Sequence, residues 1–321
     1  MVLFLAVLIA LKLGAVPVST TDLAIGLGKT LVGQADTLPT DLRLIFTELR
    51  MPRVLLGILV GAALSVAGAG FQALLRNPLA DPYVLGVSSG AALGAIISLA
   101  IASRATIATP FAAFAGAGLT ITAVYFLGRR AGQLDSHTLL LAGVITASFL
   151  GGAISFLMTT LSGGNLRGMA FWLMGDLSTP APVPAGFLFF VLFLAIGAIY
   201  TTAPDLNLLL SGEQEAIHLG VDVTRVKLVV YISASVLTGL AVSVSGAIGY
   251  VGLVVPHFMR LLFGPDYRVL IPVSAFGGAI AIVLTDALAR TIFAPTELPV
   301  GAVMALVGAP LFIYLLRRRF S

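Results

Sequence analysis

The sequence of 321 residues contains no cysteine and few charged side chains. The absence of cysteine excludes a disulfide framework, thiolate catalysis and a cysteine-ligated metal site. Asp, Glu, Lys and Arg make up 10% of the chain, whereas soluble domains carry about 25%. Hydrophobic residues account for 59% and the mean hydropathy is +1.08, so the composition is that of a polytopic membrane protein.

Long apolar runs predict an all-α fold with about ten transmembrane helices in a single domain, residues 1–321. A helix needs roughly 20 residues to cross about 30 Å of hydrocarbon. The ten candidate windows are 2–18, 54–75, 84–102, 110–127, 138–161, 184–201, 228–247, 250–263, 269–288 and 300–316. The first window lacks the basic start and the small-residue cleavage site of a signal peptide, so we expect it to remain as a span.

The net charge of +4 lies mainly at loop ends, which suits a membrane protein and argues against a nucleic-acid-binding face. Ten spans place both termini on one side of the membrane. The Arg317-Arg318-Arg319 cluster and Arg129-Arg130 favour the cytoplasm for that side. Arginines at the opposite ends of the spans would suit the docking of an acidic partner from outside.

Residues 202–227 form the one long polar interruption in the second half of the chain. Within it, residues 212–220 have the acidic start and the glycine end of a helix of about two turns. Its apolar residues Ala216, Ile217 and Leu219 would lie toward one side. This short helix would give a soluble partner a surface to contact and to move. The segment alone leaves one alternative open, which is a solvated loop.

Two enzyme-like patterns lack the sequence context that their chemistry needs. Gly28-Lys29-Thr30 resembles the end of a phosphate-binding loop, but the required first glycine is replaced by Leu23 and no apolar strand precedes it. We therefore expect no ATPase site in this chain. Ser88 lies in a Gly-x-Ser-x-Gly pattern that also lacks a preceding strand. An intramembrane serine protease that pairs Ser88 with His257 remains one alternative.

Ionisable residues are rare inside the predicted spans. Asp286 and Arg290 lie one helical turn apart and are expected to pair. A carrier driven by an ion gradient typically keeps carboxylates or histidines in the membrane as a relay, and beyond His257 no such relay is evident. A secondary transporter remains the other alternative. Glycines four residues apart, such as Gly57 and Gly61, predict close helix packing.

Seven short motifs, in this order, resemble the permease subunits of type II ABC importers, the FecCD-type family that takes up ferric siderophores, haem and vitamin B12. The motifs are Arg50-Met51-Pro52-Arg53, Gln72-Ala73-Leu74 through Asn77-Pro78-Leu79-Ala80-Asp81-Pro82, Leu85-Gly86-Val87-Ser88, Leu139-Leu140-Leu141-Ala142-Gly143, Ser245-Gly246-Ala247-Ile248-Gly249, Gly252-Leu253-Val254-Val255-Pro256-His257 and Glu297-Leu298-Pro299-Val300-Gly301. They extend over most of the chain, and the family's ten-span fold agrees with the count above.

The resemblance implies a multi-pass transport subunit, not an enzyme, in the cytoplasmic (inner) membrane of a prokaryote, with both termini in the cytoplasm. It implies that the chain works with a second copy of itself, two cytosolic ATPase subunits, an extracytoplasmic substrate-binding protein and a metal-chelate substrate, in contact with membrane lipid and without nucleic acid. ATP and Mg would be bound by the ATPase subunits, and no cofactor or metal by this chain.

The resemblance also implies roles for particular residues, none of them catalytic. Contact with the ATPase is expected in the coupling-helix segment, residues 202–227, at Glu213, Glu215, Ala216, Leu219, Gly220 and Val221. Docking of the binding protein is expected at Arg50, Arg53 and Arg290. The cytoplasmic gate is expected at Asn77 and Leu79 in one turn and at Asp135 and Ser136 in another. The translocation pathway is expected along Thr146, Ser148, Gly151 and Ser155.

Overall fold

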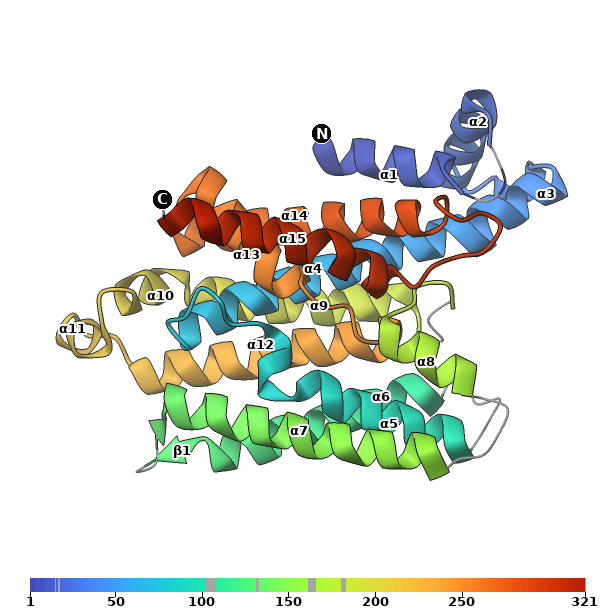
Figure 1. Cartoon of the computed structure of the whole chain (residues 1–321). Coiled ribbons are helices and arrows are strands. Elements are labelled where there is room, and N and C mark those ends of the chain that lie inside the picture. Colours follow the sequence, from blue (N-terminus) through green and yellow to red (C-terminus); the bar gives the residue numbers. More distant parts are fainter. Residues whose placement is uncertain are drawn as a thin grey trace.

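The computed structural model describes residues 1–14, 16, 18–101, 108–130, 133–160, 166–179 and 183–320. The long helices run side by side along the length of the molecule (Figure 1). Those that correspond to the ten predicted windows are α1 (Val2–Lys12), α4 (Met51–Leu74), α5 (Val87–Ile101), α6 (Ala108–Leu127), α7 (Ser136–Thr160), α9 (Ala185–Thr201), α12 (Val223–Ser245), α13 (Val251–Phe263), α14 (Tyr267–Ala289) and α15 (Val300–Phe320). The ends predicted at positions 102 and 161 lie outside the described residues.

Short elements connect these helices at both ends of the bundle. They are α2 (Thr20–Leu31), η1 (Ala35–Thr37), α3 (Thr40–Arg43), η2 (Leu44–Arg50), η3 (Pro82–Leu85), α8 (Leu166–Met174), α10 (Ala203–Leu209), α11 (Glu213–His218) and the two-residue strands β1 (Arg129–Arg130) and β2 (Gln133–Leu134). The strands pair antiparallel, with Arg129 opposite Leu134. The fold is therefore all-α apart from this one short strand pair within the described part of the chain.

Span length differs among the ten helices. Within the described residues, five helical stretches are long and apolar enough to cross a membrane alone, and α9 with α10, bent by 49°, makes a sixth. The apolar helices α1, α5 and α13 and the described part of α15, Val300–Leu315, are shorter. At 1.5 Å per residue, the 11 residues of α1 cover only about 16 Å. The predicted window 2–18 thus forms a helix that ends earlier than the prediction.

Helix α4 lies at the centre of the bundle, and small residues let its neighbours approach. A Cβ atom added at Gly61 would overlap the carbonyl oxygen of Gly278 on α14, and one added at Gly68 would overlap that of Gly252 on α13. Close backbone approach of this kind replaces the hydrophobic effect as the driving force for packing between helices in lipid. The predicted glycine packing is confirmed at Gly61 and is also found at Gly68, whereas a Cβ atom at Gly57 would make only ordinary side-chain contacts, at 3.4 Å or more.

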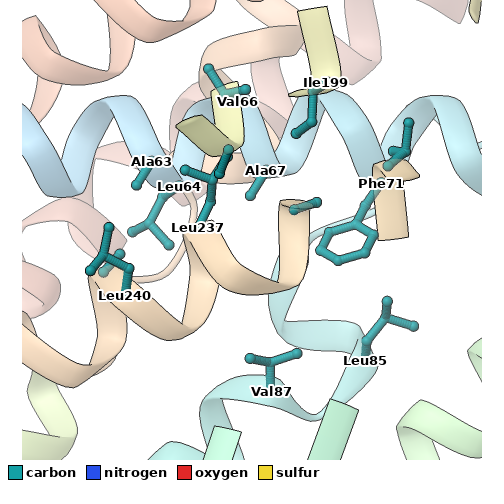
Figure 2. Close-up of a cluster of buried hydrophobic side chains, with 14 of the residues drawn as sticks. Ala63, Leu64, Val66, Ala67, Phe71, Leu85, Val87, Ile199, Leu237 and Leu240 are labelled. Atoms are coloured by element: carbon teal, nitrogen blue, oxygen red, sulfur yellow. The ribbon is translucent and has the colours of Figure 1, made fainter. Parts of the chain in front are cut away.

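Larger side chains fill the space between α4 and its other neighbours. Figure 2 shows Leu64 and Phe71 of α4 near Leu237 of α12 and Ile199 of α9. All four side chains are at most 1% exposed, and they belong to one continuous hydrophobic core. This core fixes the ends of α4, α9 and α12, from which the polar segments described below project.

Candidate coupling and gate site

The polar segment 202–227 forms two short helices at one end of the bundle. Helices α10 and α11 lie at the same end as strand β1 and the C-terminal end of α15, opposite the end that carries α2, α3 and α8 (Figure 1). Helix α11 follows Gly212, which has a φ of 131°, and is followed by Gly220, which has a φ of 86°. Glycine accepts such angles without strain. The predicted helix within residues 212–220 is confirmed.

Helix α10 was not singled out from the sequence, although it carries two signals of a helix start. Pro204 lies in its first turn, and Asp205 adds a negative charge there. With seven residues, it is too short for a periodic pattern to stand out. Asn207 fastens α10 to the beginning of α14, because its side chain donates to Asp266 at 2.6 Å and accepts from the backbone of Tyr267 at 2.9 Å.

The surface of α11 exposes some of the residues that are predicted to contact the ATPase. Glu215, Leu219 and Gly220 are exposed, and Ile217, which the prediction left out, is 52% exposed. Ala216 and Val221 are buried in this chain, unlike the other predicted contact residues named here, and their contact with the ATPase stays a prediction. The helical period turns Ala216 inward while its neighbours Glu215 and Ile217 face outward.

Glu213 pairs within the chain. Its carboxylate accepts a hydrogen bond of 2.6 Å from the ammonium group of Lys227 on α12. The same ammonium group donates to the carbonyl oxygen of Leu134 in β2 at 3.2 Å. Lys227 is 7% exposed, and these two partners offset the cost of burying its charge. A cavity of about 250 Å³ lies between Lys227, Glu213 and Ile217.

The first predicted gate turn follows the end of α4. The side chain of Asn77 accepts from the backbone N–H of Leu79 at 2.9 Å, which closes a tight turn and leaves Leu79 43% exposed. Gln72 supports this turn from α4 by donating to the carbonyl oxygens of Ala80 and, on α13, of Gly252. The turn therefore rests on a buried amide and presents an apolar tip.

Asp81 and Tyr83 continue this turn into α5. Asp81 is half-buried, and burial raises the pKa of its carboxyl group to about 6, while the bond it accepts from the backbone of Tyr83 opposes the shift. The hydroxyl of Tyr83 donates to the carbonyl oxygen of Ile248 and accepts from the backbone N–H of the same residue. This two-way bond holds the α4–α5 connection against the segment before α13.

The second predicted gate turn lies at the start of α7. The carboxylate of Asp135 accepts from the backbone and the hydroxyl of Thr138, at 2.9 and 2.6 Å, and so stabilises the first turn of the helix. The hydroxyl of Ser136 donates to the carbonyl oxygen of Leu74 at 3.2 Å. Because Leu74 is the last residue of α4 and the first turn follows it, this bond joins the two predicted gate turns.

The predicted pathway residues lie on α7. Ser148 and Ser155 are exposed, and Thr146 and Gly151 are half-buried. The exposed face also carries large apolar side chains, among them Ile145 at 61% and Phe149 at 74% exposure. Helix α7 thus presents to its surroundings a mixed face of hydroxyl and apolar groups that this chain does not cover.

The three arginines predicted to dock a binding protein are buried at the end of the bundle that carries α2 and α3. Arg50, Arg53 and Arg290 are 5%, 9% and 4% exposed. Arg53 binds Asp286 at 2.9 Å and Glu297 at 2.7 Å, and Arg290 binds Asp286 at 3.1 Å, which confirms the predicted pair of Asp286 and Arg290.

Arg50 and Arg290 also stabilise the end of α1. Arg50 donates to the carbonyl oxygens of Leu11 and Lys12, and Arg290 donates to that of Ala10. These carbonyls belong to the last turn of a helix, where no backbone N–H follows to bind them. The guanidinium groups of all three arginines therefore bind groups inside this chain, and their role in docking a binding protein stays a prediction.

The two enzyme-like patterns also have the wrong structural context. Gly28, Lys29 and Thr30 lie in the last turns of α2 instead of in a loop before a helix. Ser88 lies in the first turn of α5 and follows the 3-10 turn η3 instead of a strand. Within the described residues, no three His, Asp or Glu side chains lie close enough together to hold a metal ion.

Comparisons with known proteins agree with this geometry. The FecCD transport family matches residues 2–318 of the chain. The cobalamin import system permease protein BtuC of Halobacterium salinarum is 45% identical over 287 residues, which cover 88% of this chain and 75% of that protein. The hemin transport system permease protein HmuU of Yersinia pestis is 40% identical over 287 residues, which cover 86% of this chain and 84% of that protein. A solved metal-chelate type ABC transporter in an inward-facing conformation has a TM-score of 0.86 at 27% identity, and the match covers 99% of this chain and 96% of that one.

Proposed function

The chain belongs to the FecCD transport family and is a membrane-spanning permease subunit of an ABC transporter, and on this premise we propose that it imports a metal chelate. The chelate is a ferric siderophore, haem or cobalamin, delivered by an extracytoplasmic binding protein. Two copies of the chain form the pathway in the cytoplasmic membrane of a prokaryote. Two cytosolic ATPase subunits bind ATP and Mg and supply the energy.

The arrangement of α11 and the two gate turns carries this proposal. A short helix with exposed Glu215, Ile217 and Leu219 lies at the same end of the bundle as both turns. When ATP draws the two ATPase subunits together, they move α11, and the turns at Leu79 and Ser136 open or close. The chain itself does no chemistry on its cargo.

The charges at this end favour the cytoplasm. Arg129 in β1 and Arg225 at the start of α12 are exposed, and β1 lies at the same end of the bundle as α11. Lys and Arg near span ends are enriched on the cytoplasmic side of membrane proteins. With α11 in the cytoplasm, the arginine cluster around Asp286 lies near the outer face, and both chain termini are assigned to the cytoplasm.

The uncovered helix faces support a second copy of the chain. Exposed apolar side chains line α7, with Phe149 and Phe156, and α15, with Leu306 and Ile313. A helix face that carries Ser148 and Ser155 beside such groups is better covered by a partner and a solute than by lipid alone. We assign the α7 faces of the two copies to the walls of the pathway.

The class of cargo rests on the relatives and on the chemistry of that wall. The relatives named above carry cobalamin and hemin, both large chelates. Helix α7 offers hydroxyl and apolar groups along Thr146, Ser148 and Ser155 and contains no Asp, Glu, Lys or Arg. Such a wall binds no part of the cargo strongly, which suits the passage of a large molecule.

Uptake into proteoliposomes tests the proposal. Vesicles would contain the chain with its ATPase subunits, and hemin, cyanocobalamin and ferric dicitrate would be offered on the outside, each with a binding protein. We expect uptake of one of them that requires ATP inside and stops with a hydrolysis-deficient ATPase subunit. Uptake driven by a proton or sodium gradient in vesicles without the ATPase would overturn it in favour of a secondary transporter.

A further inference from the structure

Lys227 bonds to two elements that are far apart in the sequence. Its ammonium group lies 2.6 Å from the carboxylate of Glu213, in the first turn of α11, and 3.2 Å from the carbonyl oxygen of Leu134 in β2. An ammonium group has three N–H donors, so it can bind both acceptors at once. The contact therefore joins the exposed helix α11 to the strand that precedes the second gate turn.

From Leu134 the connection continues to the first gate turn through two residues. Asp135 and Ser136 follow Leu134 directly, and the hydroxyl of Ser136 donates to the carbonyl oxygen of Leu74 at the end of α4. The backbone N–H of Asp135 also donates to Gly128, at the end of α6, at 3.2 Å. A displacement of β2 thus reaches the ends of both α4 and α6.

Because Lys227 is buried, its ammonium group depends on the carboxylate of Glu213 as its counter-charge. The residue is 7% exposed, whereas Glu213 keeps 32% of its side chain in solvent and α11 lies at the surface. If α11 moves and takes Glu213 away, the ammonium group loses its counter-charge in a buried position, which is costly. Lys227 must then follow Glu213 or lose its pair, and either event changes its bond to Leu134.

We propose that Lys227 is a positioning residue that transmits the displacement of α11 to the second gate turn through Glu213 and the carbonyl group of Leu134. The inference rests on the proposed function, in which α11 is moved by an ATPase subunit. It deepens that function by naming the side chain that links the surface helix to the gate. The Lys227 side chain touches neither cargo nor nucleotide in this role.

A distance measurement without any partner protein provides the first test. Because the natural sequence has no cysteine, cysteines at Gln214 on α11 and His137 at the start of α7 are unique sites for spin labels, and both positions are exposed. We expect a narrow distance distribution in the parent and in Lys227→Arg, which keeps a cation with several donors. Lys227→Met and Glu213→Gln should broaden the distribution. An unchanged distribution in Lys227→Met would overturn the inference.

Coupling in the reconstituted transporter provides the second test. We expect Lys227→Met to lower the number of cargo molecules transported per ATP by about 5-fold or more, with basal ATP hydrolysis retained and Lys227→Arg restoring the ratio. Lys29→Met is the matched control, because Lys29 is half-buried at the other end and donates to one carbonyl group, that of Thr37. Equal losses of uptake and hydrolysis in Lys227→Met would overturn the inference, since they indicate a purely structural role. If the transporter shows no ATP-driven uptake at all, the proposed function fails, while the spin-label result still decides whether Lys227 joins α11 to the gate turn.

Discussion

The two ends of the bundle use the same kind of polar contact to hold different kinds of element. At the end near α2 and α3, Arg53, Asp286 and Arg290 are buried and bind long helices together. At the opposite end, Lys227 binds the short helix α11 and the strand β2, and Ser136 joins the second gate turn to the end of α4. Exposed residues lie next to these contacts in the chain. A contact between two long helices is held in place by the many side chains packed around it. A contact to a six-residue helix has fewer such neighbours, so that helix can move more easily.

This difference indicates where the molecule moves. Close packing of Gly61 against Gly278 and the ion pairs around Asp286 make α4 and α14 one rigid body. Helices α10 and α11 and the two gate turns meet that body through the polar contacts of a few side chains, such as Asn207 and Ser136, and through the few buried side chains of each short helix. The motion that drives transport is therefore expected at the α11 end.

The largest expected effect comes from breaking the buried cluster. Asp286→Ala leaves Arg53 and Arg290 without their shared carboxylate at positions less than 10% exposed, which typically costs about 3–5 kcal/mol of unfolding free energy. Thermal and denaturant unfolding of the purified chain in detergent measure this loss.

The matched control is the exposed pair of Arg43 and Asp36 at the same end, with side chains 50% and 90% exposed. Asp36→Ala should change the free energy of unfolding by less than about 1 kcal/mol. Equal losses in the two variants would show that the cluster does not stabilise the rigid half.

A bulky residue at Gly61 should destabilise the same half by a smaller amount. Gly61→Val places side-chain atoms on the backbone of Gly278, and overpacking of this kind costs about 1–3 kcal/mol. Gly197→Ala on α9 is the control, because a Cβ atom there meets no other atom within 4 Å. The unfolding transitions of both variants check the prediction, and a stable Gly61→Val variant would argue against close packing of α4 and α14.

Substitutions of two glutamates on α11 should distinguish the ion pair within this chain from the proposed contact with the ATPase subunit. Glu215 is exposed, so Glu215→Gln should weaken binding of the ATPase subunit several-fold and leave the free energy of unfolding within about 0.5 kcal/mol. Glu213 is paired with Lys227, so Glu213→Gln should cost about 1 kcal/mol of stability and change ATPase binding less. Affinity capture of the ATPase subunit and unfolding curves compare the two, and identical behaviour would contradict the distinction.

The smallest expected effect is a change in pH dependence at the first gate turn. Burial raises the pKa of Asp81 to about 6, whereas an unfolded Asp titrates near 3.9. Between these values the folded chain binds more protons than the unfolded chain, so the contribution of this group to stability is present at low pH and falls as the pH rises toward 6. Asp81→Asn should flatten the stability profile in that window, as measured by unfolding at a series of pH values.

Asp266 is a control because its pKa is shifted in the opposite direction to that of Asp81. The backbone N–H of Arg268 and the side chain of Asn207 donate to its carboxylate and lower its pKa. Its contribution to stability is therefore present above about pH 4 and is lost as the pH falls through its lowered pKa. A variant Asp266→Asn that changed the profile in the same direction as Asp81→Asn would contradict the assignment of both groups.

Much of the fold could be predicted from the sequence because hydrophobic runs and glycine spacing are local signals. Each of the ten predicted windows contains a helix, and the helix within residues 212–220 begins and ends at its glycines. The pair of Asp286 and Arg290 follows from helical spacing alone. These features depend on residues that are neighbours in the chain.

The site was harder to predict because its contacts join distant parts of the chain. Arg53 and Asp286 are 233 positions apart, and no residue near Arg53 in the sequence indicates that its partner lies on α14. The arginines therefore resembled exposed docking residues. In the same way Lys227 lay at the edge of a predicted span, and its bond to Leu134, 93 positions away, is visible only in the folded chain.

The sidedness of α11 is the most direct test of the proposed mechanism. A cysteine at Gln214 would be treated in intact cells with a membrane-impermeant maleimide. The reference is a cysteine at the exposed Gln34, in the connection between α2 and α3, which lie at the opposite end of the bundle. We expect labelling at position 34 in intact cells and at position 214 only after the membrane is permeabilised. Labelling at position 214 in intact cells would place α11 outside, beyond the reach of a cytosolic ATPase, and would contradict the mechanism.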